Sequence, residues 1–262
     1  MYKRQPAGCA LLHFPSAPAG PPSAAAAAAR DGGGDAARAL AATRRALRAA
    51  ARNGGYVRLM LAAGVLAGAN AGWQGMLQAI LAPAGFSDRV AGVFGFLNSV
   101  GLNVGALASA SLADRCCRRR LKRLIAGAMV ALALVAAWWS WGCCYASLPA
   151  ALGGGGGGAG RAGAGALGGA ILAMGLAQGC ADPLFYELGA ELTYPASEAI
   201  SGAVLVLVWN MTTLVVLALP PSLGRTMNWI WVAGIGACLL LVASVRERYL
   251  RPIDDALAVA AH

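Results

Sequence analysis

Six blocks of apolar residues dominate this 262-residue chain, and each is long enough to cross a lipid bilayer as a helix. A spanning helix needs roughly 20 mostly apolar residues, because the hydrocarbon core offers the backbone no hydrogen-bond partner. The blocks run over Val57–Leu81, Ala91–Ala113, Leu124–Tyr145, Ala166–Tyr186, Ile200–Leu219 and Asn228–Val245. We expect Asp182-Pro183 to interrupt the fourth block. The sequence therefore predicts an all-α membrane protein with six transmembrane helices.

The composition excludes an ordinary soluble domain. Hydrophobic residues make up 58% of the chain and charged residues 12%, whereas soluble domains carry about 25% charged residues. The net charge of +10 does not call for nucleic acid, because basic residues beside a membrane act as topology signals and contact anionic lipids. We therefore expect the lipid bilayer, and no nucleic acid, as a partner.

The distribution of Lys and Arg predicts the orientation of the chain. If residues 1–58 are cytoplasmic, the segments on that side hold 18 of the 21 Lys and Arg residues. The loops on the opposite side hold only Arg89, Arg161 and Arg225. Because an excess of Lys and Arg marks the cytoplasmic side, both termini are predicted to be cytoplasmic. The plasma membrane and endolysosomal membranes both fit.

Composition also divides the chain into four segments. Residues 1–35 are rich in Ala, Gly and Pro, which predicts a disordered low-complexity segment. Residues 36–56 carry arginines at helical spacing and predict a basic cytoplasmic helix or linker at the membrane surface. Residues 57–245 form the predicted six-helix transmembrane domain, and residues 246–262 form a cytoplasmic tail.

Tryptophans gather near the predicted outer ends of two spans. In this topology the third span ends and the sixth begins at the outer face of the membrane. Amphipathic indole rings prefer that interface. We therefore predict an anchoring role for Trp138, Trp139, Trp141, Trp229 and Trp231.

The chain lacks the residue patterns of an enzyme or a metal site. Its cysteines show no paired CxxC spacing, and its two histidines are His13 and His262. The glycine run that starts at Gly153 precedes no GK[ST], and no nucleophile and base are recognisable together. We predict no catalytic residue, no metal and no cofactor.

Polar residues inside the predicted spans are the candidates for substrate binding. A polar side chain in lipid is costly and usually faces a pathway or a partner helix. On this ground we predict that the substrate is bound by Trp73, Gln74, Gln78 and Asn210. Helix packing is the alternative for each of them. The glycines Gly64, Gly68 and Gly72 fit either a close helix contact or a helix that bends beside a cavity.

The loop after the second span carries a first resemblance. It reads Ala110-Ser-Leu-Ala-Asp-Arg-Cys-Cys-Arg-Arg and resembles the cytoplasmic signature of the major facilitator superfamily, a small residue followed by D-R-x-G-R-R. The matching residues are Asp114, Arg115, Arg118 and Arg119. Such a cluster can form one set of ion pairs in one conformation and release it in another. An ordinary positive-inside loop is the alternative reading.

A second resemblance is more specific. Residues 185–201 read FYELGAELTYPASEAIS and resemble the F-E-L-x-x-E-x-T-Y-P-x-x-E-G stretch of the feline leukaemia virus subgroup C receptor-related family. The first span and its exit, AGWQGMLQAILAPAGFSDRVAG, look most like the branch called disrupted in renal carcinoma 2. Ala199 departs from the family glycine, and Asp182 stands where a neutral residue is expected.

The resemblance implies a fold and an activity. Family members are twelve-helix facilitators associated with haem, choline or related organic cations, and in the closest branch with a vitamin-like pyridine. By this likeness the six helices are the C-terminal half of a major-facilitator fold, and the cavity residues fall near Trp73 and Asn210. Glu187 and Glu191, at the cytoplasmic end of their helix, are then expected to gate or form ion pairs with the arginines of the loop.

A carrier of this kind binds its substrate between two six-helix halves that rock against each other. No further apolar span precedes Val57, so we expect a partner for the cavity. Three explanations stay open: a truncated chain, a separate N-terminal half or a second copy as partner, and a transport-inactive half-carrier that acts as a membrane scaffold or partner subunit.

Overall fold

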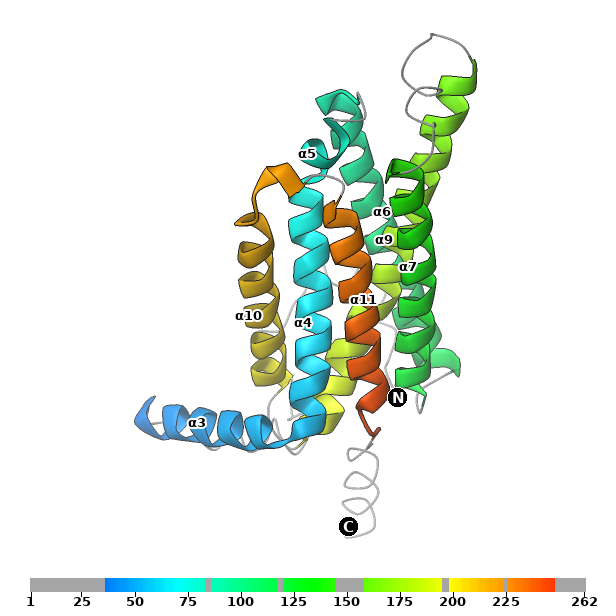
Figure 1. Cartoon of the computed structure of the whole chain (residues 1–262). Coiled ribbons are helices and arrows are strands. Elements are labelled where there is room, and N and C mark those ends of the chain that lie inside the picture. Colours follow the sequence, from blue (N-terminus) through cyan, green and yellow to red (C-terminus); the bar gives the residue numbers. More distant parts are fainter. Residues whose placement is uncertain are drawn as a thin grey trace, which may run out of the picture. The chain divides into compact units, whose positions relative to one another are not determined.

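The computed structural model describes residues 36–82, 86–116, 120–144, 158–194, 198–223 and 226–247. Every regular element within these residues is helical. The chain forms two compact units, Met1–Ala46 and Leu47–His262. Figure 1 shows the long helices of the second unit packed side by side as a bundle. They are α4 (Gly54–Gly75), α6 (Asp88–Cys116), α7 (Leu121–Cys144), α9 (Gly158–Thr193), α10 (Glu198–Leu217) and α11 (Thr226–Ser244). Two short helices connect them, α5 (Leu77–Leu81) and η2 (Pro221–Leu223).

Four of these helices are long and apolar enough to cross a membrane, as far as the described residues go. They are α6, α7, α10 and α11, with spans of 24, 22, 20 and 19 residues. The all-helical prediction is therefore confirmed, and the apolar helices fit a membrane protein. The predicted count of six spans is not confirmed by the described residues, which give four.

The other two predicted spans are helices of a different character. Helix α4 occupies the first span, but 11 of its 22 residues are buried inside the bundle. A helix enclosed by its neighbours needs no apolar outer surface, so it tolerates Asn70 and Gln74 together with several glycines. Helix α9 occupies the fourth span and carries glycines, Gln178 and Asp182. Neither helix is among the four apolar spans found within the described residues.

The basic segment before the bundle is helical. Helix α3 (Ala36–Arg52) lies inside the predicted segment 36–56, and Arg44, Arg45 and Arg48 are exposed on it. Its placement on the membrane surface stays a prediction. The predicted disordered segment, residues 1–35, lies outside the described residues, as does most of the predicted tail, from residue 248 onward.

Helices α6 and α9 cross in direct backbone contact. The contact is formed by Gly101 and Gly105 of α6 and by Gly175 and Gly179 of α9. A Cβ atom on Gly175 would collide with the carbonyl oxygen of Asn98, and the other three glycines face backbone atoms in the same way. Pairs of small residues four positions apart allow this close approach. In lipid, helices associate through such close packing, because the hydrophobic effect does not drive them together.

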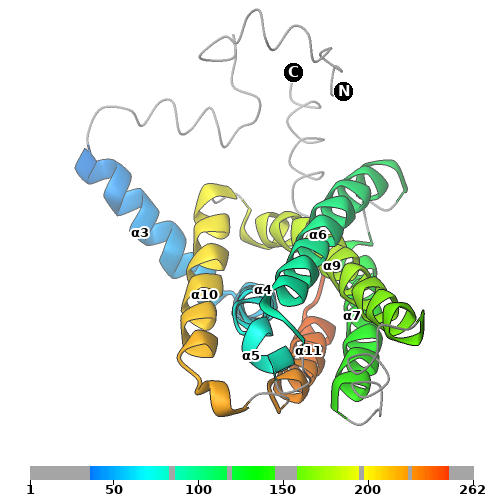
Figure 2. The same ribbon diagram turned by 90° about the horizontal axis from the view of Figure 1, so that it is seen from above.

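A second glycine contact joins α4 to α10. A Cβ on Gly64 would lie 2.5 Å from Cγ1 of Val208, and one on Gly72 would lie 2.5 Å from Cβ of Val216. Between them, Gly68 faces the backbone of Trp209. The ladder Gly64–Gly68–Gly72 therefore serves close helix contact. Figure 2 shows α4 between α10 and α11 as a result.

Two helix ends differ from the prediction. The first span breaks at Met76, whose φ of −97° and ψ of 3° end α4, and α5 continues as a separate short helix. The fourth span, in contrast, is not interrupted at Asp182-Pro183, because α9 is continuous with Pro183 inside it. Proline removes one backbone hydrogen bond and can bend a helix without ending it.

The glycine crossing can be tested by adding one methyl group. We expect Gly175→Ala to lower the thermal unfolding midpoint of the purified chain in detergent. The new Cβ would meet backbone atoms of α6, which cannot rotate away as a side chain can. Overpacking of this kind costs about 1–3 kcal/mol.

The matched control is Gly236→Ala in α11, where an added Cβ meets no atom within 4 Å. Its midpoint should be unchanged or slightly higher, because Ala favours helix over Gly. Equal midpoints for the two variants would contradict the role given to the α6–α9 crossing.

Candidate functional site

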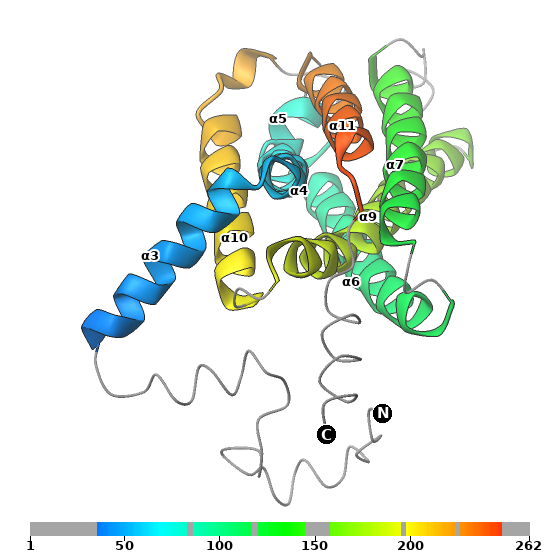
Figure 3. The same ribbon diagram turned by 90° about the horizontal axis from the view of Figure 1, so that it is seen from below.

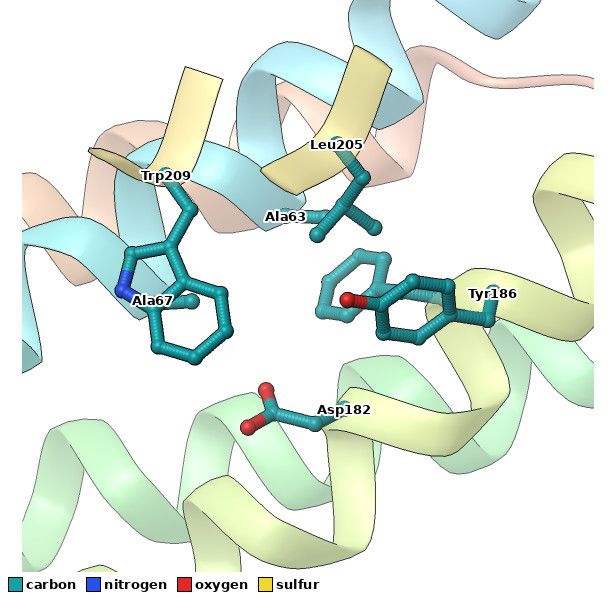
Figure 4. A pocket seen from close by; sticks show the side chains of 7 residues that line it. Ala63, Ala67, Asp182, Tyr186, Leu205 and Trp209 are labelled. Carbon is teal, nitrogen blue, oxygen red and sulfur yellow. The ribbon is translucent and has the colours of Figure 1, made fainter. Parts of the chain in front are cut away.

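A small pocket opens between α4, α9 and α10 (Figure 4). Its volume is about 30 Å³. The side chains that line it are Ala63, Ala67, Asp182, Phe185, Tyr186, Leu205 and Trp209. One carboxyl group therefore shares the pocket with three aromatic rings.

The pocket exists because of small residues on α4. Ala63 and Ala67 lie one turn apart on this helix, next to the glycines that hold α10 close. Their short side chains leave a space that the neighbouring helices do not fill. Asp182 reaches this space from α9, and Trp209 reaches it from α10 (Figure 4).

Asp182 is held in place by its own helix. The Nε2 amide of Gln178 donates a hydrogen bond of 2.8 Å to Oδ1 of Asp182. Gln178 is buried, and its Oε1 atom has no hydrogen-bond partner within the described residues. Both side chains therefore keep acceptor atoms that a cation or a hydrogen-bond donor can satisfy.

The aromatic walls add a second preference for positive charge. Trp209 and Tyr186 remain 38% and 39% exposed, and Figure 4 shows the Asp182 carboxylate directed into the space between them. A cation over an aromatic face gains about 0.5–2 kcal/mol. A carboxylate between aromatic rings is therefore suited to an organic cation.

The pocket as it stands is too small for such a solute. A volume of 30 Å³ accommodates one or two water molecules, whereas sites for small molecules measure roughly 300–1,000 Å³. In this conformation the residues form one wall of a site and not a complete site.

The predicted substrate residue Trp73 lies elsewhere, in an aromatic cluster. Its ring stacks on Trp231 with centroids 4.8 Å apart, and it meets Trp139 edge-on at 6.2 Å. Its Nε1 donates a hydrogen bond of 2.8 Å to Oδ1 of Asn228. Trp73 is 1% exposed, so in this conformation it packs α4 against α7 and α11.

The other three predicted substrate residues are not gathered around Trp73. Gln78 donates a hydrogen bond of 2.8 Å to Oδ1 of Asp88 at the start of α6. Asn210 is exposed on α10 and donates to the carbonyl oxygen of Val206 on its own helix. Gln74 is half-buried on α4. No cavity found within the described residues unites the four, and their substrate role stays a prediction.

Two of the five predicted interface anchors are not at an interface. Trp139 and Trp231 are 0% and 3% exposed and belong to the aromatic cluster. Trp138 and Trp141 are exposed, as an anchor must be. Neighbouring positions on a helix point about 100° apart, so adjacent tryptophans cannot share one environment.

The predicted gating residues are only partly described. Asp114 and Arg115 lie in the last turn of α6, while Arg118 and Arg119 lie outside the described residues. Glu187 and Glu191 are in α9, and Glu191 is buried. Their ion-pair role stays a prediction.

Hydrogen bonds at the same end of the bundle were not predicted. Nζ of Lys122 donates to the carbonyl oxygens of Ala243 and Val245, at 2.7 and 2.6 Å, and so ties α7 to the end of α11. Nδ2 of Asn53 donates to the carbonyl oxygen of Leu192 at 2.8 Å and ties α4 to α9. Figure 3 views the bundle from this end.

The pocket residues Asp182, Tyr186 and Trp209 were also missed as a site. One signal in the sequence points to Asp182, because it is the only Asp or Glu within the six predicted spans. An ionisable residue at that depth marks a functional site by default. The partners of Asp182 come from distant parts of the chain, and no local pattern indicates them.

A comparison of the chain with protein-family models finds no match. Within the described residues, no group of three His, Cys, Asp or Glu side chains is arranged to hold a metal ion.

The packing role of Trp73 can be tested with its hydrogen-bond partner. Trp73→Phe leaves Oδ1 of the buried Asn228 without a donor, which costs about 1–3 kcal/mol. We expect a lower unfolding midpoint in detergent for this variant.

The double variant Trp73→Phe/Asn228→Leu should recover part of that loss, because it removes the unpaired amide as well. Nδ2 of Asn228 already lacks a partner within the described residues. A double variant less stable than Trp73→Phe alone would argue against this hydrogen bond.

Proposed function

We propose that the chain is one half of a membrane carrier that moves a small organic cation across the bilayer by alternating access. The observation that carries this proposal is the Asp182 carboxylate, held by Gln178 in a pocket between Trp209 and Tyr186. An isolated carboxylate within an apolar helical bundle is costly, and it is usually kept for a pathway, a proton or a ligand.

Each pocket residue has a part in binding. Asp182 neutralises the charge of the solute, and the rings of Trp209 and Tyr186 contact its methyl or methylene groups through cation–π attraction. Gln178, buried behind the pocket, fixes the carboxylate on α9 through its hydrogen bond of 2.8 Å. A negatively charged solute is disfavoured by the same carboxylate, so haem, with its two propionates, suits this wall less well than choline or a protonated pyridine.

The carrier is completed by a second six-helix unit. In this proposal α4, α6, α7, α9, α10 and α11 all span the membrane as the C-terminal half of a major-facilitator fold, with both termini in the cytoplasm. A separate N-terminal half or a second copy supplies the facing wall and enlarges the 30 Å³ space to the volume that a solute needs. The resemblance to the receptor-related family supports the same assignment.

Rocking of the two halves requires contacts that break on one side of the membrane. The predicted cluster of Asp114, Arg115, Arg118 and Arg119 with Glu187 and Glu191 is assigned this gating role.

A transport-inactive scaffold is the second candidate function. The dense packing around Trp73, whose aromatic cluster leaves no room for solute, favours it. A scaffold needs a stable bundle and does not need Asp182 in a pocket, so the two functions make opposite predictions for that residue.

Uptake of labelled choline by cells that express the full chain, and that can supply a partner half, tests the proposal. We expect Asp182→Asn to reduce uptake tenfold or more at equal protein abundance, because loss of about 1.4 kcal/mol in binding is a factor of ten. Trp209→Ala should reduce it by up to about 30-fold, the upper range of a cation–π contact. The neutral isostere 3,3-dimethylbutanol should not compete.

The matched control is Trp138→Ala, which removes an exposed tryptophan on α7, a helix that does not line the pocket. Its uptake should equal that of the unaltered chain. If Asp182→Asn changes uptake no more than this control does, the pocket does not carry the cation, and the scaffold function is the better account.

A further inference from the structure

A larger cavity lies between the first turns of α6 and the adjoining part of α9. Its volume is about 480 Å³, within the range of small-molecule sites. Val93, Phe94 and Leu97 form the wall on α6, and Leu172 faces them from α9. Apart from one arginine, every side chain that lines this groove is apolar or is a glycine.

The groove follows from the way the two helices cross. Helices α6 and α9 touch at their glycine contact and separate from there, as Figure 2 shows. On the separating part of α9, a Cβ at Gly165 or at Gly169 would meet no atom within 4 Å. The missing side chains therefore leave the groove open along α9.

The apolar lining of this groove determines which molecules can occupy it. Apolar cavities do not retain water, and a gap left empty loses the dispersion contacts of the atoms around it. Helix α6 is one of the four helices fit to span a membrane, so lipid chains are the nearest apolar molecules. An acyl chain fills such a groove without leaving the hydrocarbon phase.

One charged group lies at the end of the groove. Arg89 lines it from the first turn of α6, where the candidate span Asp88–Ser111 begins. The ends of a spanning helix lie near the lipid head groups. Arg89 is exposed and forms no ion pair within the described residues. Its neighbour Asp88 is hydrogen-bonded to Gln78 of α5 instead. A guanidinium binds phosphate with paired hydrogen bonds.

We propose that this groove is a specific site for an anionic phospholipid, with one acyl chain between α6 and α9 and the phosphate bound by Arg89. The site is separate from the Asp182 pocket and does not depend on transport.

Native mass spectrometry of the full chain tests the site, with phosphatidylglycerol and phosphatidylcholine of identical acyl chains added to the detergent. The unaltered chain should retain one phosphatidylglycerol in preference to phosphatidylcholine. Arg89→Gln should weaken phosphatidylglycerol binding about tenfold, the effect of one lost charge-assisted hydrogen bond. Gly169→Leu should fill the groove and weaken the retention of both lipids.

Gly236→Leu in α11 is the matched control, since that position is equally open and lies outside the groove; it should bind as the unaltered chain does. Gly165→Leu repeats the test if Gly169→Leu fails to fold. The proposal is overturned if the folded groove variants retain phosphatidylglycerol normally, if Gly236→Leu loses it to the same degree, or if Arg89→Gln keeps the preference. Displacement of the lipid by inorganic phosphate alone would also overturn it, because the acyl chain would then contribute nothing.

Discussion

Direct contact between helix backbones is the constraint on which the rest of this structure depends. Lipid chains are as apolar as leucine, so helices in a membrane gain little by hiding apolar side chains from their surroundings. They associate through close packing, and here glycines provide it in two places. The pair α6–α9 meets at Gly101 and Gly175, and the pair α4–α10 meets along the ladder that contains Gly68.

Other small residues of the same helices create the two cavities. Where a small residue faces a backbone, the helices touch; where it faces outward or between two helices, a space remains. Ala63 and Ala67 leave the pocket that Asp182 enters, and Gly165 and Gly169 leave the groove that ends at Arg89. Each cavity thus has one ionisable group in an otherwise apolar or aromatic lining, a carboxyl group in the pocket and a guanidinium group in the groove.

The sequence predicted the helices well because apolar length is a local property. The starts of α6, α7, α10 and α11 lie within three residues of the predicted spans. The sequence could not predict contacts between residues that are far apart along the chain. The stacking of Trp73 on Trp231 and the meeting of Asp182 with Trp209 depend on which helices are neighbours. Proline gave the wrong indication at Pro183, because α9 continues through a residue that disfavours helix.

The α6–α9 crossing also constrains how the protein is made. Gly175 follows Gly101 by 74 residues, and a ribosome needs roughly 4–15 s to add them at 5–20 residues per second. In a chain that spans the membrane as proposed, α6 enters it before the helix that covers its glycine surface, and α7 is inserted in between. Nascent chains therefore pass through a stage in which the backbone of α6 is open to any other small-residue helix nearby. Insertion chaperones and the speed of translation are then as relevant to a correct fold as the final contacts.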